Sequence, residues 1–365
     1  MDWIYITTAI VAFLYFIIVI IFIVGWNKIN PFVPKGNEQI KTLISVIVTC
    51  KNEEKHIRQL ISCMAQQSNQ NFEFILVNDH STDATKNYIK AAQVSLPKIV
   101  LVDSVGHGKK KAQREGILQA KGDLIVVTDA DCLPSYHWLE SIYCFQKKTS
   151  CDLIISPVKL SGKESIFSYL QVLEFTSLVG AAAGSTGAGM PILCNGANLA
   201  FTKKMWEKCQ NDLHDEEQSG DDMFLLESVK KRGGIIRFLK SESAFVTTKQ
   251  SESLKEFVIQ RRRWTSKSSS FRDWQVIFTA SVVLAICILM LGLFVLSFYQ
   301  TNYLILFSLL FVFKYVLDSF YLTNLGKFFQ LNHIWLFDIL LSILYPFYIV
   351  LTVFSTFLIK PKKWK

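Results

Sequence analysis

The sequence contains no C-x-x-C pair, although its 365 residues include eight cysteines. Their irregular spacing argues against a disulfide framework and against a zinc site, and it favours reduced thiols in the cytosol. The pattern G-x-x-x-x-G-K-S/T is also absent, which excludes a P-loop nucleotide hydrolase. No base-stacking or groove-reading motif accompanies the net charge of +9. We therefore expect no nucleic-acid partner and attribute the basic surplus to anionic lipid headgroups and phosphates.

Charged residues are missing from the apolar stretch Trp3–Trp26, which is long enough to cross a bilayer. No basic residue precedes it, and its core is too long for a cleavable signal peptide. Trp274–Phe313 is also uncharged, and a short polar break inside it predicts a helical hairpin. A further apolar stretch covers Ile334–Ile359. We therefore predict an integral membrane protein with an N-terminal transmembrane helix over residues 1–27 and about three C-terminal transmembrane helices over residues 274–359.

Basic residues indicate the side of the bilayer on which the central part of the chain lies. Lys28, Lys35 and Lys41 follow the first apolar stretch, whereas a single acidic residue precedes it. Arginines cluster again before the second stretch, at residues 261–263. By the positive-inside rule, residues 42–272 are then cytoplasmic. Four spans would return the basic C-terminal tail to the side of the N-terminus, against this rule. Tail charges carry less weight, so four spans remain our expectation.

The central residues alternate short β-branched runs with helical stretches. This alternation is typical of a parallel sheet with helices on both faces. We therefore predict an α/β domain over residues 42–272. The four predicted strands cover residues 43–49, 72–77, 98–102 and 123–128.

Polar side chains follow these strands, at the end of the sheet where ligands of open parallel sheets bind. Asp129 and Asp131 lie two residues apart, so their carboxylates point the same way and attract a divalent cation. The alternative is an Asp-rich turn before Pro134. Asp79 could accept hydrogen bonds from a nucleoside or could cap the next helix. Lys109 opens a helix after two glycines, where phosphate is attracted, unless it belongs to a solvated lysine run.

Three further charged clusters lie in the second half of the sequence. Asp221 and Asp222 stand at a predicted helix start, where they could serve in catalysis or could simply complement the helix dipole. In Gln260–Trp264, one arginine and the tryptophan could hold a diphosphate and a sugar ring, or the segment could form a juxtamembrane basic patch with an interface tryptophan. Lys314 and Asp318, four residues apart in a predicted span, are expected to neutralise each other.

In combination, these motifs resemble those of family 2 glycosyltransferases, which are inverting enzymes of the GT-A fold. The resemblance covers roughly residues 43–270, with six motifs in order. Asp221 replaces the usual Glu, and Arg114 stands where Asn is common. The motifs are C-K-N-E-E at 50–54 (similar to Y-N-E-E), N-D-H-S-T-D at 78–83 (D-D-G-S-T-D), the G-K segment at 108–116 (G-K-A-A-A-L-N-A-G), D-A-D at 129–131 (D-x-D), D-D at 221–222 (E-D) and Q-R-R-R-W at 260–264 (Q-x-x-R-W).

The resemblance implies a Rossmann-like GT-A domain, the nucleotide-diphospho-sugar transferase fold. It also implies a nucleotide-sugar donor, usually linked to uridine, and a divalent cation, Mg²⁺ or Mn²⁺. Asp222 would be the catalytic base, and Asp131, with Asp129, would hold the cation on the leaving diphosphate. Trp264 would also line the acceptor end. The residues expected to bind the donor are Asn52, Glu53, Asp79, Lys109, Asp129, Gln260, Arg263 and Trp264.

The apolar segments near these motifs suggest the acceptor. Ile166–Val179 is apolar on more than one helical face, which fits a core helix or an interfacial helix. The run Gly180–Gly189, rich in Gly, Ala and Ser, is expected to be a flexible loop. Because Trp264 lies close to a predicted span, we expect a membrane lipid or lipid-linked glycan as acceptor. The alternatives are a processive polysaccharide synthase and a non-catalytic membrane scaffold or transporter.

Overall fold

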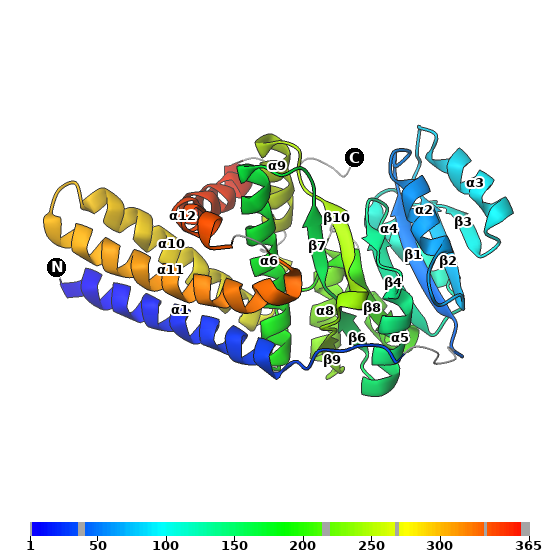
Figure 1. Ribbon diagram of the computed structural model, residues 1–365, viewed down its shortest axis with the longest axis horizontal. Coiled ribbons are helices and arrows are strands. Elements are labelled where there is room, and N and C mark those ends of the chain that lie inside the picture. Colours follow the sequence, from blue (N-terminus) through cyan, green and yellow to red (C-terminus); the bar gives the residue numbers. More distant parts are fainter. Residues whose placement is uncertain (1, 36–40, 214–219, 267–269, 332–333, 359–365) are drawn as a thin grey trace. The chain divides into compact units, whose positions relative to one another are not determined.

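The chain divides into two compact units, drawn together in Figure 1. The helical unit consists of Met1–Lys28, Gly162–Ile192 and Gln250–Lys362. The sheet unit consists of Ile29–Ser161, Leu193–Lys249 and Lys363–Lys365. Each unit is assembled from segments that are distant in the sequence. The computed structural model describes residues 2–35, 41–213, 220–266, 270–331 and 334–358.

A seven-stranded sheet forms the core of the sheet unit, in the order β3-β2-β1-β4-β8-β6-β9. Neighbouring strands from β3 to β4 run parallel, whereas β8 runs antiparallel to both β4 and β6. The predicted parallel sheet is thus confirmed for its four strands, with boundaries shifted by one residue, and the sheet becomes mixed beyond β4. The strands are β1 (Ile44–Cys50), β2 (Phe72–Asn78), β3 (Ile99–Asp103), β4 (Leu124–Asp129), β6 (Leu153–Ile155), β8 (Leu199–Thr202) and β9 (Ile236–Phe238).

Both faces of the central strands are covered. Successive side chains of a strand point to opposite faces, and every residue of β1 and β2 is buried. Such strands are near-continuous apolar runs rather than alternating ones, which is why they could be recognised in the sequence. The helices that follow the first strands are α2 (Ile57–Ala65), α3 (Thr85–Ser95), α4 (Lys109–Gln119) and α5 (Trp138–Thr149).

The strands β1, β2 and β4 end at one edge of the sheet. Their register pairs Cys50 with Asn78 and Thr49 with Asp129, so the loops that follow them start side by side. This edge therefore collects the polar residues that the sequence places after each strand. The remaining elements of the sheet unit are β5 (Leu133–Pro134), β7 (Val158–Ser161), β10 (Val246–Lys249), α7 (Lys203–Cys209) and α8 (Asp221–Lys231).

Long apolar helices make up most of the helical unit. Among the described residues, five are long and apolar enough to cross a membrane: α1, α6, α10, α11 and α12. The predicted hairpin is confirmed by α10 and α11, and the last apolar stretch by α12. The fifth candidate, beyond the four that were expected, is α6. The helices are α1 (Asp2–Lys28), α6 (Ile166–Gly187), α9 (Leu254–Thr265), α10 (Trp274–Leu296), α11 (Thr301–Phe329) and α12 (Ile334–Leu358).

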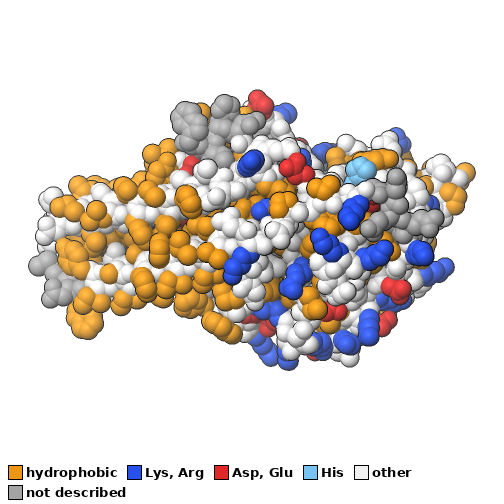
Figure 2. Space-filling view, turned by 60° about the horizontal axis from the view of Figure 1, so that its bottom comes forward, with side chains coloured by type: hydrophobic (Ala, Val, Ile, Leu, Met, Phe, Trp, Pro, Cys, Tyr) orange, Lys and Arg blue, Asp and Glu red, His pale blue; other side chains and the backbone are white. Residues whose placement is uncertain are grey.

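Large apolar side chains cover much of the surface of these helices, as Figure 2 shows in orange. Phe13 of α1, Leu309 of α11 and Leu351 of α12 are 61%, 64% and 68% exposed. In contrast, 56% of the most apolar segment of α6 is buried inside the protein, against 17% of the corresponding segment of α11. Extended apolar surface of this kind marks a membrane or protein contact, so α11 suits a lipid environment while α6 packs inside the unit.

The predicted flexible loop over Gly180–Gly189 is wrong, because α6 continues as a helix to Gly187. Glycine here permits close helix packing instead of flexibility. A Cβ atom on Gly25 of α1 would lie 1.8 Å from the carbonyl oxygen of Gly184, and one on Gly180 would lie 2.3 Å from Leu325 of α11. Small residues at helix crossings let the backbones approach, as is common in membrane helix packing.

The expected neutralising pair within α11 is confirmed. Lys314, which is only 2% exposed, donates to Asp318 one turn further along the helix. Tyr15 of α1 donates its hydroxyl to the other oxygen of Asp318, at 2.5 Å. The two charges therefore lie inside the helical unit as a paired, hydrogen-bonded group.

Candidate active site

The loop after β1 is joined to the loop after β2. Asn52 has a left-handed backbone (φ 57°), and its side-chain oxygen accepts a hydrogen bond from the amide of Thr82 at 2.9 Å. Glu54 accepts from the amide of Ala84 at 3.1 Å, and Asp83 accepts from the amide of Glu54 at 3.1 Å. These contacts fix the two loops against each other at the edge where a donor is expected.

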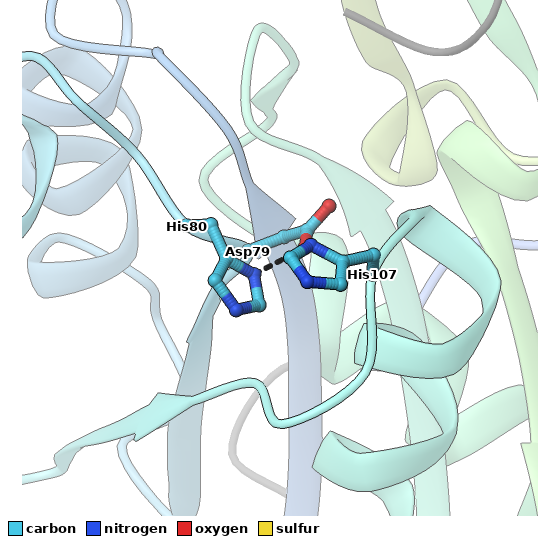
Figure 3. A group of neighbouring side chains, drawn as sticks. All are labelled: Asp79, His80 and His107. Atoms are coloured by element: carbon cyan, nitrogen blue, oxygen red, sulfur yellow. Dashed lines mark hydrogen bonds and ion pairs between the residues drawn. The ribbon is translucent and has the colours of Figure 1, made fainter.

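Asp79 lies at the expected edge but beneath the surface. Its side chain is fully buried, with one oxygen accepting from the amide of Gly108 at 3.1 Å and the other lying 3.0 Å from Nδ1 of His80. Figure 3 shows His80 and His107 beside it. His80 stands where the family pattern has Gly, which is the one signal in the sequence that this position is unusual.

Asp129 and Asp131 lie together after β4, as their spacing predicts. Lys109, in the first turn of α4, donates to Asp129. Burial and the neighbouring charge of Asp129 raise the pKa of Asp131, while Lys109 opposes that rise. Cys132 lies in the same cluster, but burial and the two carboxylates raise the pKa of its thiol well above its usual range. The thiol therefore stays protonated, and the two carboxylates form an oxygen donor set that suits a hard cation.

Glu53 adds a third carboxylate to this region. Its amide donates to Thr85 at 2.7 Å, and its carboxylate lies 2.8 Å from Nδ1 of His56. Burial raises the pKa of Glu53, His56 lowers it, and the charges of Asp131 and Asp129 raise it further. Glu53 was predicted from the sequence but His56 was not, although its position three residues after Glu53, in the turn before α2, was the available signal.

Asp222 lies in the first turn of α8, after Gly220, whose φ of 105° is accessible to glycine. One carboxylate oxygen accepts from the amide of Gly196 at 3.0 Å, and the other from the amide of Met223 at 2.9 Å. The side chain is only partly buried. Two amide donors thus hold a carboxylate at a helix start with part of its surface open, where it could accept a proton.

The neighbouring Asp221 contacts a different group. Lys110 follows Lys109 in the sequence, and its Nζ lies 3.8 Å from Asp221. Lys110 is 6% exposed, donates to the carbonyl of Leu213 and lies 4.9 Å from the ring centroid of Phe224. Lys110 was not predicted from the sequence, because three consecutive lysines give no indication of which one is buried.

Gln260, Arg263 and Trp264 lie on α9, in the helical unit. Their neighbour Arg261 is the buried member of the arginine run: it binds both carboxylate oxygens of Glu174 on α6 and lies 4.2 Å from the ring centroid of Trp264. Tyr348 of α12 donates to the same carboxylate at 3.1 Å. A buried ion pair with two hydrogen bonds therefore fixes α9 and the ring of Trp264 within this unit.

Two family models match the sequence. "Glycosyl transferase family 2" matches residues 45–187, and "Glycosyl transferase family group 2" matches residues 124–358, more than half of the chain. The chain belongs to glycosyltransferase family 2. It is therefore a transferase, in agreement with the six motifs that the sequence presents in order.

The chain is also similar to curated proteins of this family. It is 27% identical over 165 residues to the poly-beta-1,6-N-acetyl-D-glucosamine synthase of Staphylococcus aureus (strain COL), covering 44% of this chain and 39% of the synthase. It is 26% identical over 246 residues to "Probable glycosyltransferase YdaM" of Bacillus subtilis (strain 168), covering 64% of this chain and 57% of that protein. The matches thus span about 39% and 57% of the relatives' lengths.

One solved structure covers nearly the whole chain. It is the mannosyltransferase PcManGT from Pyrobaculum calidifontis, in complex with GDP-Man and Mn²⁺. The TM-score is 0.50 at 16% identity, and the match covers 90% of this chain and 99% of that one. At this identity the likeness concerns the fold alone. It agrees with the GT-A fold that the family match and the mixed α/β sheet show.

Proposed function

We propose that this chain is a membrane-bound inverting glycosyltransferase. It transfers a sugar from a nucleotide-sugar, linked to UDP, to a hydroxyl on a membrane lipid or lipid-linked glycan. Residues 42–272 form the catalytic domain, with a transmembrane helix over residues 1–27 and a transmembrane region over residues 274–359. The observation that carries the proposal is the collection of Lys109, Asp129 and Asp131 at one sheet edge.

The donor end of the reaction uses this edge. Asp131 and Asp129 would hold a divalent cation, which supplies positive charge to the leaving diphosphate. Lys109 adds a further positive charge beside the same group. Asn52, Glu53 and Asp79 belong to the joined loops next to it and form the nucleoside and ribose end. The carboxylate of Asp79 is fully buried, with His80 and the amide of Gly108 on its oxygens, so nucleoside binding there requires a local rearrangement.

The acceptor end uses Asp222 as general base. The acceptor oxygen attacks the anomeric carbon from the side opposite the diphosphate, and its proton passes to the carboxylate of Asp222. The bond between the anomeric carbon and the diphosphate oxygen breaks, the nucleoside diphosphate leaves, and the configuration inverts. The amides of Gly196 and Met223 hold the carboxylate of Asp222 in place.

The helical unit supports a membrane acceptor. The signature residues Gln260, Arg263 and Trp264 lie on α9, which packs with the long apolar helices α6 and α12. The buried pair of Glu174 and Arg261 makes this association specific. Trp264, which is expected to line the acceptor end, would then lie at the level of lipid headgroups. The basic residues that flank the apolar stretches support a cytoplasmic catalytic domain.

A donor screen tests the proposal. Purified full-length protein is incubated with radiolabelled UDP-sugars, Mg²⁺ or Mn²⁺, and extracted membrane lipids. We expect UDP release together with label in the lipid phase, and loss of both in Asp222→Asn. Label found only in soluble sugars would refute the lipid acceptor, and the absence of UDP release with every donor would refute the donor class.

A processive polysaccharide synthase is the second candidate. It is favoured by the similarity to the poly-beta-1,6-N-acetyl-D-glucosamine synthase, which covers 39% of that protein. The same labelled products separate the two candidates by length. A single added sugar supports the lipid-directed transferase, whereas a ladder of polymer lengths supports the synthase.

A further inference from the structure

A cluster of nitrogen and oxygen ligands lies at the end of β2 and just before α4. Asp79, His80 and His107 each offer one ligand atom, and these atoms lie within 4.8 Å of one another. Figure 3 shows the two imidazole rings side by side, next to the carboxylate of Asp79. Asp79 is buried, whereas both histidines are exposed, so an ion from solvent can reach the rings.

The carboxylate of Asp79 orients the ring of His80. Nδ1 of His80 lies 3.0 Å from one carboxylate oxygen, so this nitrogen carries the proton when the ring is neutral. Nε2 is then left with its lone pair as a metal ligand. Metal-binding histidines in proteins commonly donate their other ring N–H to a carboxylate in this way. The second oxygen of Asp79 accepts from the amide of Gly108, which fixes the carboxylate itself.

His107 supplies the second imidazole. Its ring centroid lies 3.9 Å from that of His80, with 24° between the ring planes. The in-plane lone pairs of stacked rings run nearly parallel, so a shared ion requires the exposed His107 ring to turn about its Cβ–Cγ bond. The turn would have to bring one nitrogen of each ring to the roughly 2.0–2.1 Å from a shared ion that zinc–imidazole bonds require.

The backbone at His80 supports a functional role for the ring. Its φ is 55°, in the left-handed region that few residues other than glycine adopt. At the matching point of the family pattern the residue is Gly, which has no strain there. Strained positions are retained where the surrounding structure uses the side chain, and here the side chain is an imidazole held by a buried carboxylate.

We propose that His80 and His107 form a second metal site, for a transition metal of the Zn²⁺ class, with Asp79 orienting the ring of His80. Imidazole nitrogens suit Zn²⁺ and its neighbours, whereas the oxygen set of Asp129 and Asp131 suits Mg²⁺ or Mn²⁺. A bound ion would hold His80 in its hydrogen bond to Asp79. If the proposed donor site is correct, on which this consequence rests, the ion then lowers the affinity for the nucleoside diphosphate.

The metal site is tested on full-length protein in detergent, stripped with a chelator and containing no nucleotide. Zn²⁺ binding is followed by calorimetry, and Co²⁺ binding by its visible absorption. His80→Asn and His107→Asn are each expected to weaken Zn²⁺ binding at least about tenfold, and Asn tolerates the left-handed backbone at position 80. The matched control is His137→Asn, another exposed histidine beside a carboxylate, Glu140, outside the cluster.

Two results would overturn the metal site. One is unchanged Zn²⁺ affinity in the double variant His80→Asn/His107→Asn. The other is loss of Zn²⁺ binding in Asp131→Asn, which would assign the ion to the carboxylates after β4. Retention of wild-type affinity in Asp131→Asn and in His137→Asn, with loss in both cluster variants, supports the site.

The consequence for the donor is measured separately, as UDP binding with and without Zn²⁺. We expect Zn²⁺ to weaken UDP binding to the wild type but not to His107→Asn. Equal UDP affinity with and without Zn²⁺ in the wild type overturns this consequence. If no variant binds UDP at all, the proposed donor is wrong, while the Zn²⁺ titration still decides the metal site by itself.

Discussion

The sheet unit contains two acidic motifs, Asp129-Ala130-Asp131 and Asp221-Asp222, whose first residues each pair with a lysine but lie in different surroundings. Asp129 and its partner Lys109 have side chains that are 33% and 28% exposed, beside Asp131. Asp221 and its partner Lys110 are only 14% and 7% exposed. Partly exposed carboxylates can exchange bound water for a cation, whereas the carboxylate of a covered ion pair cannot easily do so. The first pair therefore suits metal binding, and the second fixes the start of α8.

The first turn of α4 supplies the lysine of both ion pairs. Consecutive residues of a helix point about 100° apart, so Lys109 and Lys110 reach different partners although they are neighbours in sequence. Lys109 contacts the group that would hold the cation, and Lys110 contacts the residue next to the base Asp222. Identical residue types thus acquire separate roles through their burial and their direction on the helix.

The largest effect is expected for Asp222→Asn. An amide cannot take the proton of the acceptor, so turnover should fall by about 10²–10⁴-fold while donor affinity stays near that of the wild type. UDP release and UDP binding measure the two quantities. Asp212→Asn, which removes an exposed ion pair with Arg232, is the control. Normal turnover of Asp222→Asn would mean that another group takes the proton.

The next effect is expected for Asp131→Asn. Losing a cation ligand should lower turnover by on the order of 100-fold, because the bound ion contributes several kcal/mol of charge stabilisation. Titration of the activity with Mn²⁺ should show that a higher metal concentration is needed to reach half of the residual rate. Asp123→Asn, an exposed residue just before β4, is the matched control. An unchanged Mn²⁺ titration would contradict the metal role.

The two lysines should separate stability from donor affinity. Lys110→Met removes one partner of a buried ion pair and should lower the free energy of unfolding by about 3 kcal/mol. Lys109→Met removes a partly exposed partner, so the melting temperature should stay close to that of the wild type while KM for the donor rises. Thermal unfolding in detergent and donor kinetics provide the two readouts. Equal melting temperatures for both variants would contradict the difference in burial.

The smallest effect is expected for Asp221→Glu. This variant restores the residue that the family usually carries and keeps the charge opposite Lys110. We expect a stability within about 1 kcal/mol of the wild type and nearly unchanged turnover. A loss as large as that of Lys110→Met would show that the shorter side chain of Asp221 is itself required by this pocket.

The sheet and its active edge were accessible from the sequence, because their signals are local. β1 and β4 are short runs rich in β-branched residues and buried on both faces, and parallel strands necessarily bring their following loops to one edge. The placement of Asp129, Asp131 and Lys109 follows from that rule.

Other features depend on partners distant in the sequence. From the sequence alone, Gly184 is predicted to lie in a loop. In the structure it belongs to α6 and lies against the backbone of α1 at Gly25. Likewise, nothing near Lys110 indicates that Asp221 lies beside it. The contact of Asp79 with His80 depends on the side chain that replaces the usual Gly. Such contacts are set by tertiary packing, which periodicity and motif spacing do not encode.

The most direct test of the account is the position of Mn²⁺ in the protein bound to UDP, located by anomalous scattering. We predict one strong Mn²⁺ peak in contact with the carboxylates of Asp129 and Asp131 and with the diphosphate, and no metal contact to Asp222. A peak elsewhere in the sheet unit, or coordination of Mn²⁺ by Asp222, would contradict the assignment of one acidic pair to the metal and the other to the base.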